Sequence, residues 1–270
     1  IFGGVHRIGI ISSTIVPIMA VLYILLGLYI TIANISGLPA IFAQIFQEAF
    51  DLQAIFGGFA GSCVMYGIKR GLFSNEAGMG SAPNAAATAT VSHPVKQGLI
   101  QALSVFTDTL IICSCTALII LLSDVPLDGS VKGIQLTQMA LSHQIGSVGG
   151  QFIAICILLF AFSSIVGNYS YCETNLFFIS KNKTYLQLYR IIVGGMVMFG
   201  SIAALDLVWN IADLFMAIMA ITNLIAIVLL GKNALKALQD YNRQRRIRKK
   251  NIIFKSSFIP ELKDSTSEWE

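Results

Sequence analysis

Several stretches of about 20 residues in this sequence are almost entirely apolar. One helix of that length spans the hydrocarbon core of a bilayer, so these stretches restrict the possible folds more than any other feature of the sequence. Charged residues make up only 12% of the chain and hydrophobic residues 55%. Soluble domains carry roughly 25% charged residues, about twice as many. The sequence therefore predicts an all-α integral membrane protein.

Six membrane spans are expected. They cover residues 14–35, 56–92, 97–122, 149–180, 186–204 and 209–230. A polar loop is predicted over 123–147, and the segment 39–50 is too short to cross and is expected at the surface. Together they form a transmembrane region, residues 1–235, followed by a basic tail, residues 236–270. The chain begins at Ile1 and is apolar almost at once, so we expect an N-terminal part to be missing.

Basic residues set the orientation, because Lys and Arg collect on the cytoplasmic side of short loops. Nine of the eighteen lie between Lys232 and Lys255, which predicts a cytoplasmic basic tail on a multi-pass protein of the plasma membrane. The tail has two readings: it sets the topology and is otherwise solvated, or it also contacts anionic membrane lipid. No nucleic acid partner is expected. Residues 256–270 are polar and end in acids, so we expect them to be disordered.

Enzyme signatures are missing from the sequence. It contains no P-loop, no GxSxG and no HExxH motif. The five cysteines lie in apolar segments without pairing or zinc spacing, and the three histidines are scattered. We therefore expect no enzymatic activity and no cofactor, and the Cys and His residues give no support for a metal site.

The second span is nearly 40 residues long, whereas a single helix needs about 20 to cross. Gly71, Gly78 and Gly80, followed by Pro83, favour a break near 71–80 that leaves two half-helices of about 15 residues each. Broken backbone at membrane depth needs a water-lined cavity or protein cover, and secondary transporters bind substrate and sodium at such breaks. Carbonyls before the break suit a cation, and N–H groups after it suit a carboxylate.

Asn75 lies at this break, and its amide both donates and accepts hydrogen bonds, as the two opposite charges of an amino acid require. Glu76 has two readings: it balances a bound cation, or it forms an ion pair with Lys69 or Arg70. Asp108 of the third span is likewise either a coupling group or a partner of Arg70.

The fourth span carries a polar stripe. Ser163 and Ser164 supply neutral oxygens of the kind that hard cations bind, although Ser in a membrane helix often bonds the preceding turn instead. Asn168 lies four residues after Ser164, on the same face of the helix. We therefore predict Ser163 and Ser164 as cation ligands, and Ser164 and Asn168 as substrate contacts. Glu173, near the inner end of the span, is expected to be structural.

The stretch from Gly67 to Ala82, GIKRGLFSNEAGMGSA, closely resembles the signature of the alanine or glycine:cation symporter family, also called the sodium:alanine symporter family. Further matches are His93–Gly98, Val105–Thr109, Cys113 with Thr116–Ala117, and Phe160–Ser164. The resemblance covers roughly residues 1–235. It implies a leucine-transporter-type fold with two inverted five-helix repeats. Residues 56–230 would be the second repeat, and residues 14–35 the last helix of the first.

The resemblance also implies a function, the symport of small neutral amino acids, chiefly alanine and glycine, with sodium. Leu72, Asn75 and Gly78 would line the substrate site, and Ser164 occupies a family hydroxyl position that faces the ligand or sodium. Asn168 stands where the family commonly has Trp. That change enlarges and polarises the pocket, so glycine, alanine and a slightly larger polar amino acid all stay open as substrates.

Two alternatives remain. The carrier is coupled to protons through Glu76 or Asp108, or the chain is a non-transporting scaffold or sensor that uses its basic tail. Uptake that persists without sodium but collapses with the pH gradient favours the first alternative. A scaffold would be unaffected by Asn75→Ala, whereas a carrier would lose uptake with intact expression and assembly.

Overall fold

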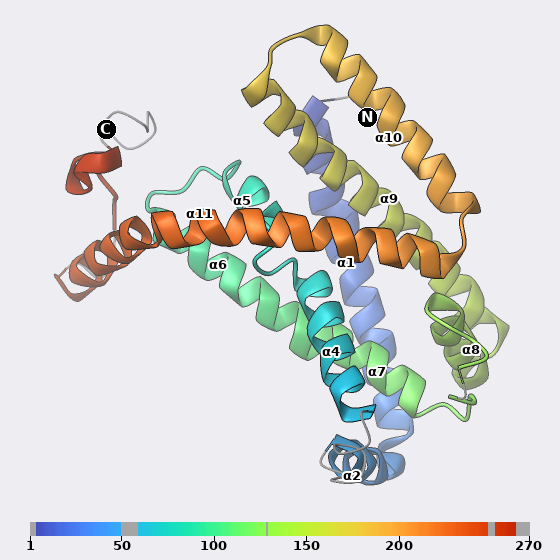
Figure 1. The fold of residues 1–270 in the computed structure, drawn as a ribbon. Helices are drawn as coiled ribbons and strands as arrows, with labels where there is room; N and C mark the ends of the chain where they lie inside the picture. Colours follow the sequence, from blue (N-terminus) through green and yellow to red (C-terminus); the bar gives the residue numbers. More distant parts are fainter. Residues whose placement is uncertain (1–3, 50–58, 128, 248–251, 263–270) are drawn as a thin grey trace. The chain divides into compact units, whose positions relative to one another are not determined.

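The structure, a computed structural model, describes residues 4–49, 59–127, 129–247 and 252–262. Within these ranges the chain is helical and contains no β-strand (Figure 1). The α-helices are α1 (Gly4–Ala33), α2 (Leu38–Ala49), α4 (Phe59–Asn75), α5 (Ser81–Ala86), α6 (Pro94–Thr107), α7 (Ser114–Leu121), α8 (Ile134–Ile145), α9 (Ser147–Ile179), α10 (Lys183–Ile202) and α11 (Leu205–Ile247). A π-helical segment, η2 (Asp108–Cys113), joins α6 to α7.

Five helices of the described chain are long and apolar enough to cross a membrane. They are Thr14–Ala33, Pro94–Leu121, Ser147–Ile179, Lys183–Ile202 and Leu205–Ile247. Large apolar side chains are exposed along them, as contact with lipid allows. The expectation of an all-α membrane protein is therefore supported. The predicted span over 56–92 is instead represented by two shorter helices, α4 of 17 residues and α5 of 6 residues.

The chain divides into two compact units, and each is described by itself. The first, called the bundle unit here, contains Ile1–Arg70 and Thr107–Met198. The second, called the break unit, contains Gly71–Phe106 and Phe199–Glu270. The predicted polar stripe on α9 belongs to the bundle unit, and the interval 71–80 belongs to the break unit.

The bundle unit packs α1, α7, α8 and α9 around one apolar core. Its buried residues are Tyr23, Ile30, Cys115, Ile119, Val125, Ala140, Leu141, Ile153 and Cys156. The hydroxyl of Tyr23 lies 2.7 Å from Oγ1 of Thr116, so a hydrogen bond links α1 to α7. Because lipid offers no water to polar groups, such internal pairing is required at this depth. The core fixes α9 and the residues that it carries.

Helix α8 lies inside the interval 123–147, which we predicted as a polar loop. Thr137, Ala140 and Leu141 are buried at the i, i+3, i+4 spacing of a helix that packs on one face. The acidic residues, Gly129 and Pro126 in the first half of the interval favour a loop there. The helical period of the second half is a separate signal, so the loop prediction was too long.

Helices α9 and α10 run antiparallel and are joined by a short connection (Figure 1). Arg190 of α10 donates hydrogen bonds to the hydroxyl of Tyr169, at 2.8 Å, and to the carboxylate of Glu173, at 3.2 Å. Tyr189 stacks on Tyr169 with ring centroids 5.5 Å apart. Ionisable groups in membrane segments are normally paired in this way. Glu173 is therefore paired between α9 and α10, as a structural role requires.

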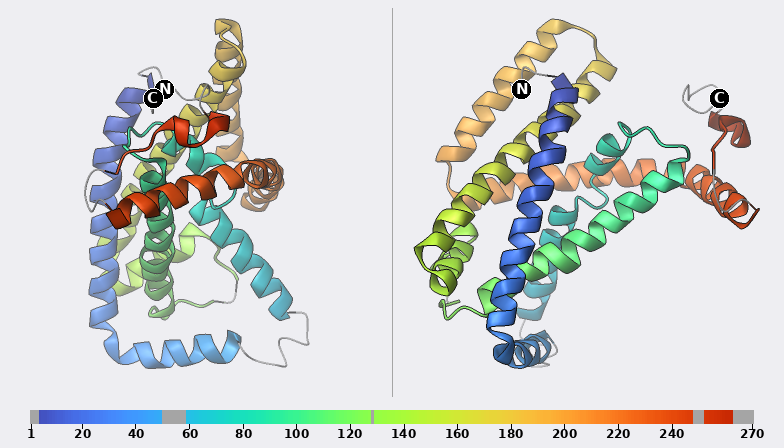
Figure 2. Two further views of the ribbon diagram at one scale, coloured as in Figure 1. Left: turned by 90° about the vertical axis from the view of Figure 1, so that its left-hand side faces the viewer. Right: turned by 180° about the vertical axis from the view of Figure 1, so that it is seen from behind.

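Helix α11 dominates the break unit. Its 43 residues correspond to about 65 Å at 1.5 Å per residue, whereas the hydrocarbon core of a bilayer is about 30 Å thick. The helix passes without interruption through the expected boundary between residues 235 and 236, and it changes direction along its C-terminal part (Figures 1 and 2). Much of the basic tail is therefore a continuation of the last span.

After α11 the C-terminal segment, residues 252–262, packs against other residues of the break unit. Phe254 and Ile259 are buried in a small cluster with Ala237 and Val95, and the N–H of Phe254 donates to the carbonyl of Ser92 at 2.8 Å.

The expected disorder of residues 256–270 is wrong for residues 256–262, which form two 3₁₀ turns, η3 (Ser256–Phe258) and η4 (Pro260–Leu262). Residues 263–270 lie outside the described residues. The prediction failed because a few spaced apolar side chains determine the packing of this segment, and its average composition hides them.

Candidate functional site

The broken helix of the break unit is the candidate substrate site. Helix α4 ends at Asn75 and α5 begins at Ser81, so residues 76–80 leave the helix inside the predicted interval. Glu76 (φ 49°), Gly78 (φ 78°) and Gly80 (φ 91°) all have left-handed backbone. Glycine adopts this conformation freely, whereas a non-glycine residue held in it is strained by roughly 1–3 kcal/mol. Such strain persists only where the surroundings hold the turn, and it is typical of binding sites.

Helix α5 is shorter than predicted, with 6 residues instead of a half-helix of about 15. The β-branched residues Thr88, Thr90 and Val91 follow it and have low helix propensity. Pro94 also disfavours the helical conformation at His93. A helix this short has little dipole, so the attraction for a carboxylate depends on the N–H groups of the turn itself.

Three backbone donors of the turn are available. In the part of the chain that the structure describes, the N–H groups of Ala77, Gly78 and Gly80 make no hydrogen bond to the protein. The N–H of Met79, by contrast, donates to the carbonyl of Glu76 at 3.3 Å. Successive free N–H groups in a left-handed turn form a concave anion-binding site. The turn therefore offers what the carboxylate of an amino acid needs.

The other predicted residues of the break unit lie along this turn. Leu72 and Asn75 are three residues apart and share a face of α4. Leu72 is exposed and Asn75 is half-buried, with its Nδ2 donating to the carbonyl of Gly71 at 3.0 Å. Apart from its two chain neighbours, no described residue has an atom within 4 Å of the Cβ position of Gly78, so the backbone there borders open space. The structure thus brings Leu72, Asn75 and Gly78 together on one short segment.

The predicted residues of α9 lie in the bundle unit. Ser163 donates its hydroxyl proton to the carbonyl of Phe160 at 2.9 Å, which is the bond to the preceding turn that Ser often makes in a membrane helix. Ser164 and Asn168 are exposed and, among the described residues, have no hydrogen-bond partner. Their joint site with Asn75 stays a prediction, because the two units are described separately. The pairing of Glu76 with Lys69 or Arg70 stays a prediction for the same reason.

Asn223 of α11 is a site residue that we did not predict. Its Nδ2 donates to the carbonyl of Gly78 at 3.0 Å, and its side chain lies against Gly80. Phe73 and Trp209 make a further contact between α4 and α11, edge to face at 5.1 Å. The sequence does contain a signal for Asn223, since an amide in an apolar span is costly unless it has a partner. It does not indicate which partner.

His93, just before α6, is at the centre of a second group of contacts in the break unit. It is fully buried, its Nδ1 accepts from the N–H of Val95 at 3.2 Å, and its Nε2 lies 3.5 Å from Oδ2 of Asp240. Its ring also meets Tyr241 and Phe254 edge to face. Burial lowers the pKa of His93 below its usual value, an effect that outweighs the opposing one of Asp240. The neutral imidazole therefore connects α6, α11 and the C-terminal segment.

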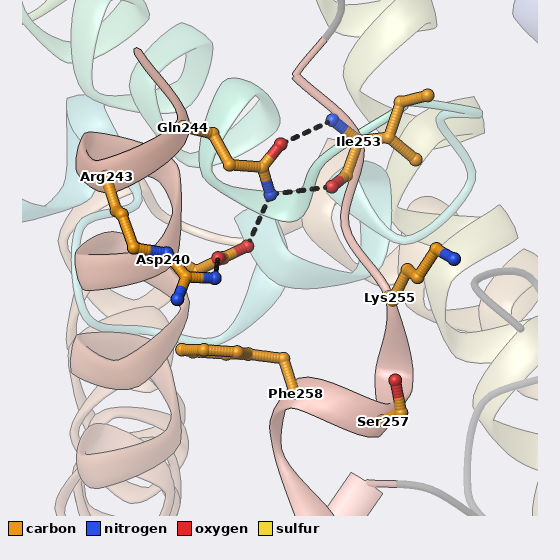
Figure 3. A pocket seen from close by; sticks show the side chains of 7 residues that line it. All are labelled: Asp240, Arg243, Gln244, Ile253, Lys255, Ser257 and Phe258. Carbon is orange, nitrogen blue, oxygen red and sulfur yellow. Dashed lines mark hydrogen bonds and ion pairs between the residues drawn. The ribbon is translucent and has the colours of Figure 1, made fainter. Parts of the chain in front are cut away.

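A cavity of about 460 Å³ lies between the end of α11 and the C-terminal segment (Figure 3). Three of its polar side chains are paired with each other. Arg243 and Gln244 both donate to Asp240, at 2.9 and 2.7 Å, and Gln244 also bonds the backbone of Ile253. None of the residues predicted to bind substrate lines this cavity. We interpret it as part of the docking of the segment.

Comparison with known proteins agrees with this architecture. Residues 1–256 match the model of the sodium:alanine symporter family. The chain is 52% identical to the amino-acid carrier protein AlsT of Bacillus subtilis (strain 168) over 270 residues, which are 100% of this chain and 57% of AlsT. It is also 52% identical to the probable sodium/glutamine symporter GlnT of the same organism over 255 residues, 94% of the chain and 53% of GlnT.

A third Bacillus subtilis (strain 168) protein, the putative sodium/proton-dependent alanine carrier YrbD, is 43% identical over 262 residues, 91% of the chain and 54% of YrbD. The chain thus spans about half the length of the curated relatives that it matches. The family model covers nearly all of the chain, so the chain belongs to the sodium:alanine symporter family.

Proposed function

We propose that the protein is a sodium-coupled symporter of small neutral amino acids, with alanine and glycine as substrates. The family to which it belongs consists of symporters, not enzymes. The observation that carries the proposal is the turn at residues 76–80, whose free N–H groups lie in a chain otherwise built for lipid. Unpaired backbone at membrane depth is tolerated where it lines a cavity or a binding site.

The turn suits both ends of a small amino acid. The N–H groups of Ala77, Gly78 and Gly80 are donors for the carboxylate. The carbonyl oxygen of the Asn75 amide is an acceptor for the ammonium group, and Leu72 supplies an apolar contact for the methyl group of alanine. The open space beside Gly78 leaves room for a substrate without a long side chain.

Ser163 and Ser164 are proposed as sodium ligands, with Ser164 and Asn168 in contact with the substrate. The hydroxyl of Ser163 donates to Phe160, and its oxygen can still accept or coordinate, because a hydroxyl has two lone pairs. A relative named for glutamine is as similar to this chain as the amino-acid carrier AlsT. Together with the amide at Asn168, this similarity makes glutamine the first larger substrate to test.

The proposed carrier works by alternating access in a leucine-transporter-type fold. Residues 56–230 form the second repeat and residues 14–35 the last helix of the first, and we expect the rest of the first repeat to complete the site. We place the protein in the bacterial inner membrane with the basic tail in the cytoplasm, because nine of its eighteen Lys and Arg lie between Lys232 and Lys255. Anionic lipid is the proposed partner of that tail.

Proton coupling is the second candidate, favoured by the similarity to a relative named sodium/proton-dependent. Glu76 and Asp108 are the carboxylates that would titrate. Uptake driven by a pH gradient in the absence of sodium supports this candidate, and uptake that stops when sodium is removed contradicts it.

The proposed site is tested by replacing Asn75. Full-length protein in proteoliposomes should lose most alanine uptake in Asn75→Ala, at unchanged protein level. Asn175→Ala is the matched control, because Nδ2 of Asn175 makes the same kind of bond to its own helix, donating to Tyr171 at 2.9 Å. Equal uptake by the two variants would contradict the assignment of Asn75.

A further inference from the structure

We propose that Asn223 is a positioning residue of the substrate site, which holds the carbonyl of Gly78 so that the turn at residues 76–80 keeps its N–H groups free for ligand. The inference rests on the proposed function. It adds a residue from a different part of the sequence, 145 positions after Gly78.

The first support is the hydrogen bond itself. Nδ2 of Asn223 donates to the carbonyl oxygen of Gly78 at 3.0 Å. Among the described residues, it is the side-chain hydrogen bond that reaches residues 76–80 from α11, whereas the bond from Asn84 to Gly80 comes from the adjoining helix α5. A carbonyl in an apolar environment without water needs such a partner. Asn223 therefore determines where the peptide group after Gly78 points.

The second support is steric. A Cβ atom on Gly80 would lie 3.2 Å from Cβ, Cγ and Oδ1 of Asn223. The side chain of Asn223 thus packs directly on the backbone of the turn, on a residue whose φ is 91°. A side chain that bonds one left-handed glycine and packs on the next restrains both.

The strained backbone at Glu76 explains why the turn needs a restraint. A non-glycine residue with φ of 49° keeps its conformation only if neighbouring interactions oppose relaxation. Without the bond from Asn223, the peptide group after Gly78 is free to rotate and to change the direction of the neighbouring N–H groups. Substrate binding would then have to order the turn, and ordering on binding weakens affinity.

The test compares Asn223→Leu, which keeps a similar volume but has no donor, with Thr222→Ala. Thr222 is the matched control because it is exposed on the same helix and, among the described residues, its hydroxyl bonds just the carbonyl of its own helix at Ile218, at 2.9 Å. In proteoliposomes, Asn223→Leu should raise the half-saturation concentration for alanine by about tenfold, with the maximal rate within about twofold of the wild type. Thr222→Ala should change neither quantity.

Asn223→Asp supplies a rescue. An ionised carboxylate cannot donate to the carbonyl of Gly78, whereas a protonated one can. Relative to wild type at the same pH, the half-saturation of Asn223→Asp should therefore approach the wild-type value as the pH is lowered to about 4, because the ordinary pKa of Asp is about 3.9 and burial raises it. A ratio that stays raised at this lower limit contradicts a donor role.

Hydrogen exchange separates this inference from the proposed function. In purified full-length protein without substrate, a peptide that covers residues 71–86 should exchange faster in Asn223→Leu and at the wild-type rate in Thr222→Ala. Unchanged exchange in Asn223→Leu overturns the inference even if the wild type transports alanine. A lower maximal rate and lower thermal stability with unchanged half-saturation would show a purely structural role and also overturn it. If the peptide exchanges faster in Asn223→Leu than in the wild type, but the wild type transports no alanine, the inference stands and only the proposed function is contradicted.

Discussion

The side chain of Asn223 fills the space beside Gly80, so that a Cβ atom on Gly80 would lie 3.2 Å from it. Gly78 has a similar left-handed backbone, with φ of 78° against 91°. Within the described part of the chain, however, no atom beyond its two chain neighbours lies within 4 Å of its Cβ position. The two glycines therefore differ in their surroundings and share their backbone requirement. They make a matched pair for separating strain from steric conflict.

Replacing either glycine with alanine should destabilise the protein. Gly78→Ala introduces only backbone strain, of about 1–2 kcal/mol, whereas Gly80→Ala adds a tight contact of 3.2 Å that Asn223 must relieve by shifting. Thermal unfolding of the purified variants should therefore rank wild type above Gly78→Ala and Gly78→Ala above Gly80→Ala. Equal melting temperatures for the two variants would show that Asn223 does not press on Gly80.

Ser164→Ala should weaken the dependence of uptake on sodium more than it harms folding, because the hydroxyl is proposed to coordinate the ion. The measurement is the sodium half-saturation of alanine uptake in liposomes. Ser170→Ala is the control, since Ser170 on the same helix bonds its own backbone at Gly167. An unchanged sodium half-saturation in Ser164→Ala would remove Ser164 from the cation site.

The ion pair between Arg190 and Glu173 should contribute to stability, because its carboxylate is mostly buried. Glu173→Gln leaves the guanidinium without a counter-charge and should lower the free energy of unfolding by about 1–3 kcal/mol. Lys236→Ala breaks the more exposed pair with Glu261 and should lower the free energy of unfolding less, because solvent screens an exposed pair. If thermal unfolding gives the reverse order, the pair on α9 and α10 is not a structural element.

Docking of the C-terminal segment should weaken in acid. Burial lowers the pKa of His93, so the unfolded or undocked form takes up the proton more readily. The stability linked to His93 is therefore fully present above its ordinary pKa of about 6.5 and is lost as the pH falls below that value. Asp240 opposes this loss, and Lys96 adds to it.

Hydrogen exchange of residues 252–262 measures this effect. Exchange should speed up between about pH 7.5 and about pH 5.5, after correction for the intrinsic effect of pH. His93→Phe keeps a ring against Tyr241 and Phe254 but cannot titrate, so its corrected exchange should vary less with pH. A variant that responds to pH as strongly as the wild type would assign the effect to another group.

The sequence was most informative where the chemistry is local. The apolar runs predicted the membrane helices, and the glycines with Asn75 directed attention to the interval in which the helix stops at Asn75. A structural role for Glu173 was expected from its position near the inner end of the fourth span. Each of these conclusions needs only the residue and its immediate neighbours.

The remaining features depend on contacts between distant residues. Asn223 reaches Gly78 across 145 positions, and nothing local to either residue indicates the other. The same holds for the C-terminal segment, where Phe254 bonds Ser92. The short α5 has a different cause, since β-branched residues after Ala86 end a helix that length considerations alone had extended.

The central claim is sodium-coupled uptake of small neutral amino acids at the broken helix. Counterflow by the full-length protein in proteoliposomes, with labelled alanine outside and a panel of unlabelled amino acids inside, tests it most directly. The account predicts exchange with alanine and glycine that requires sodium and is lost in Asn75→Ala but not in Asn175→Ala. Exchange that is indifferent to sodium, or that survives in Asn75→Ala, would contradict it.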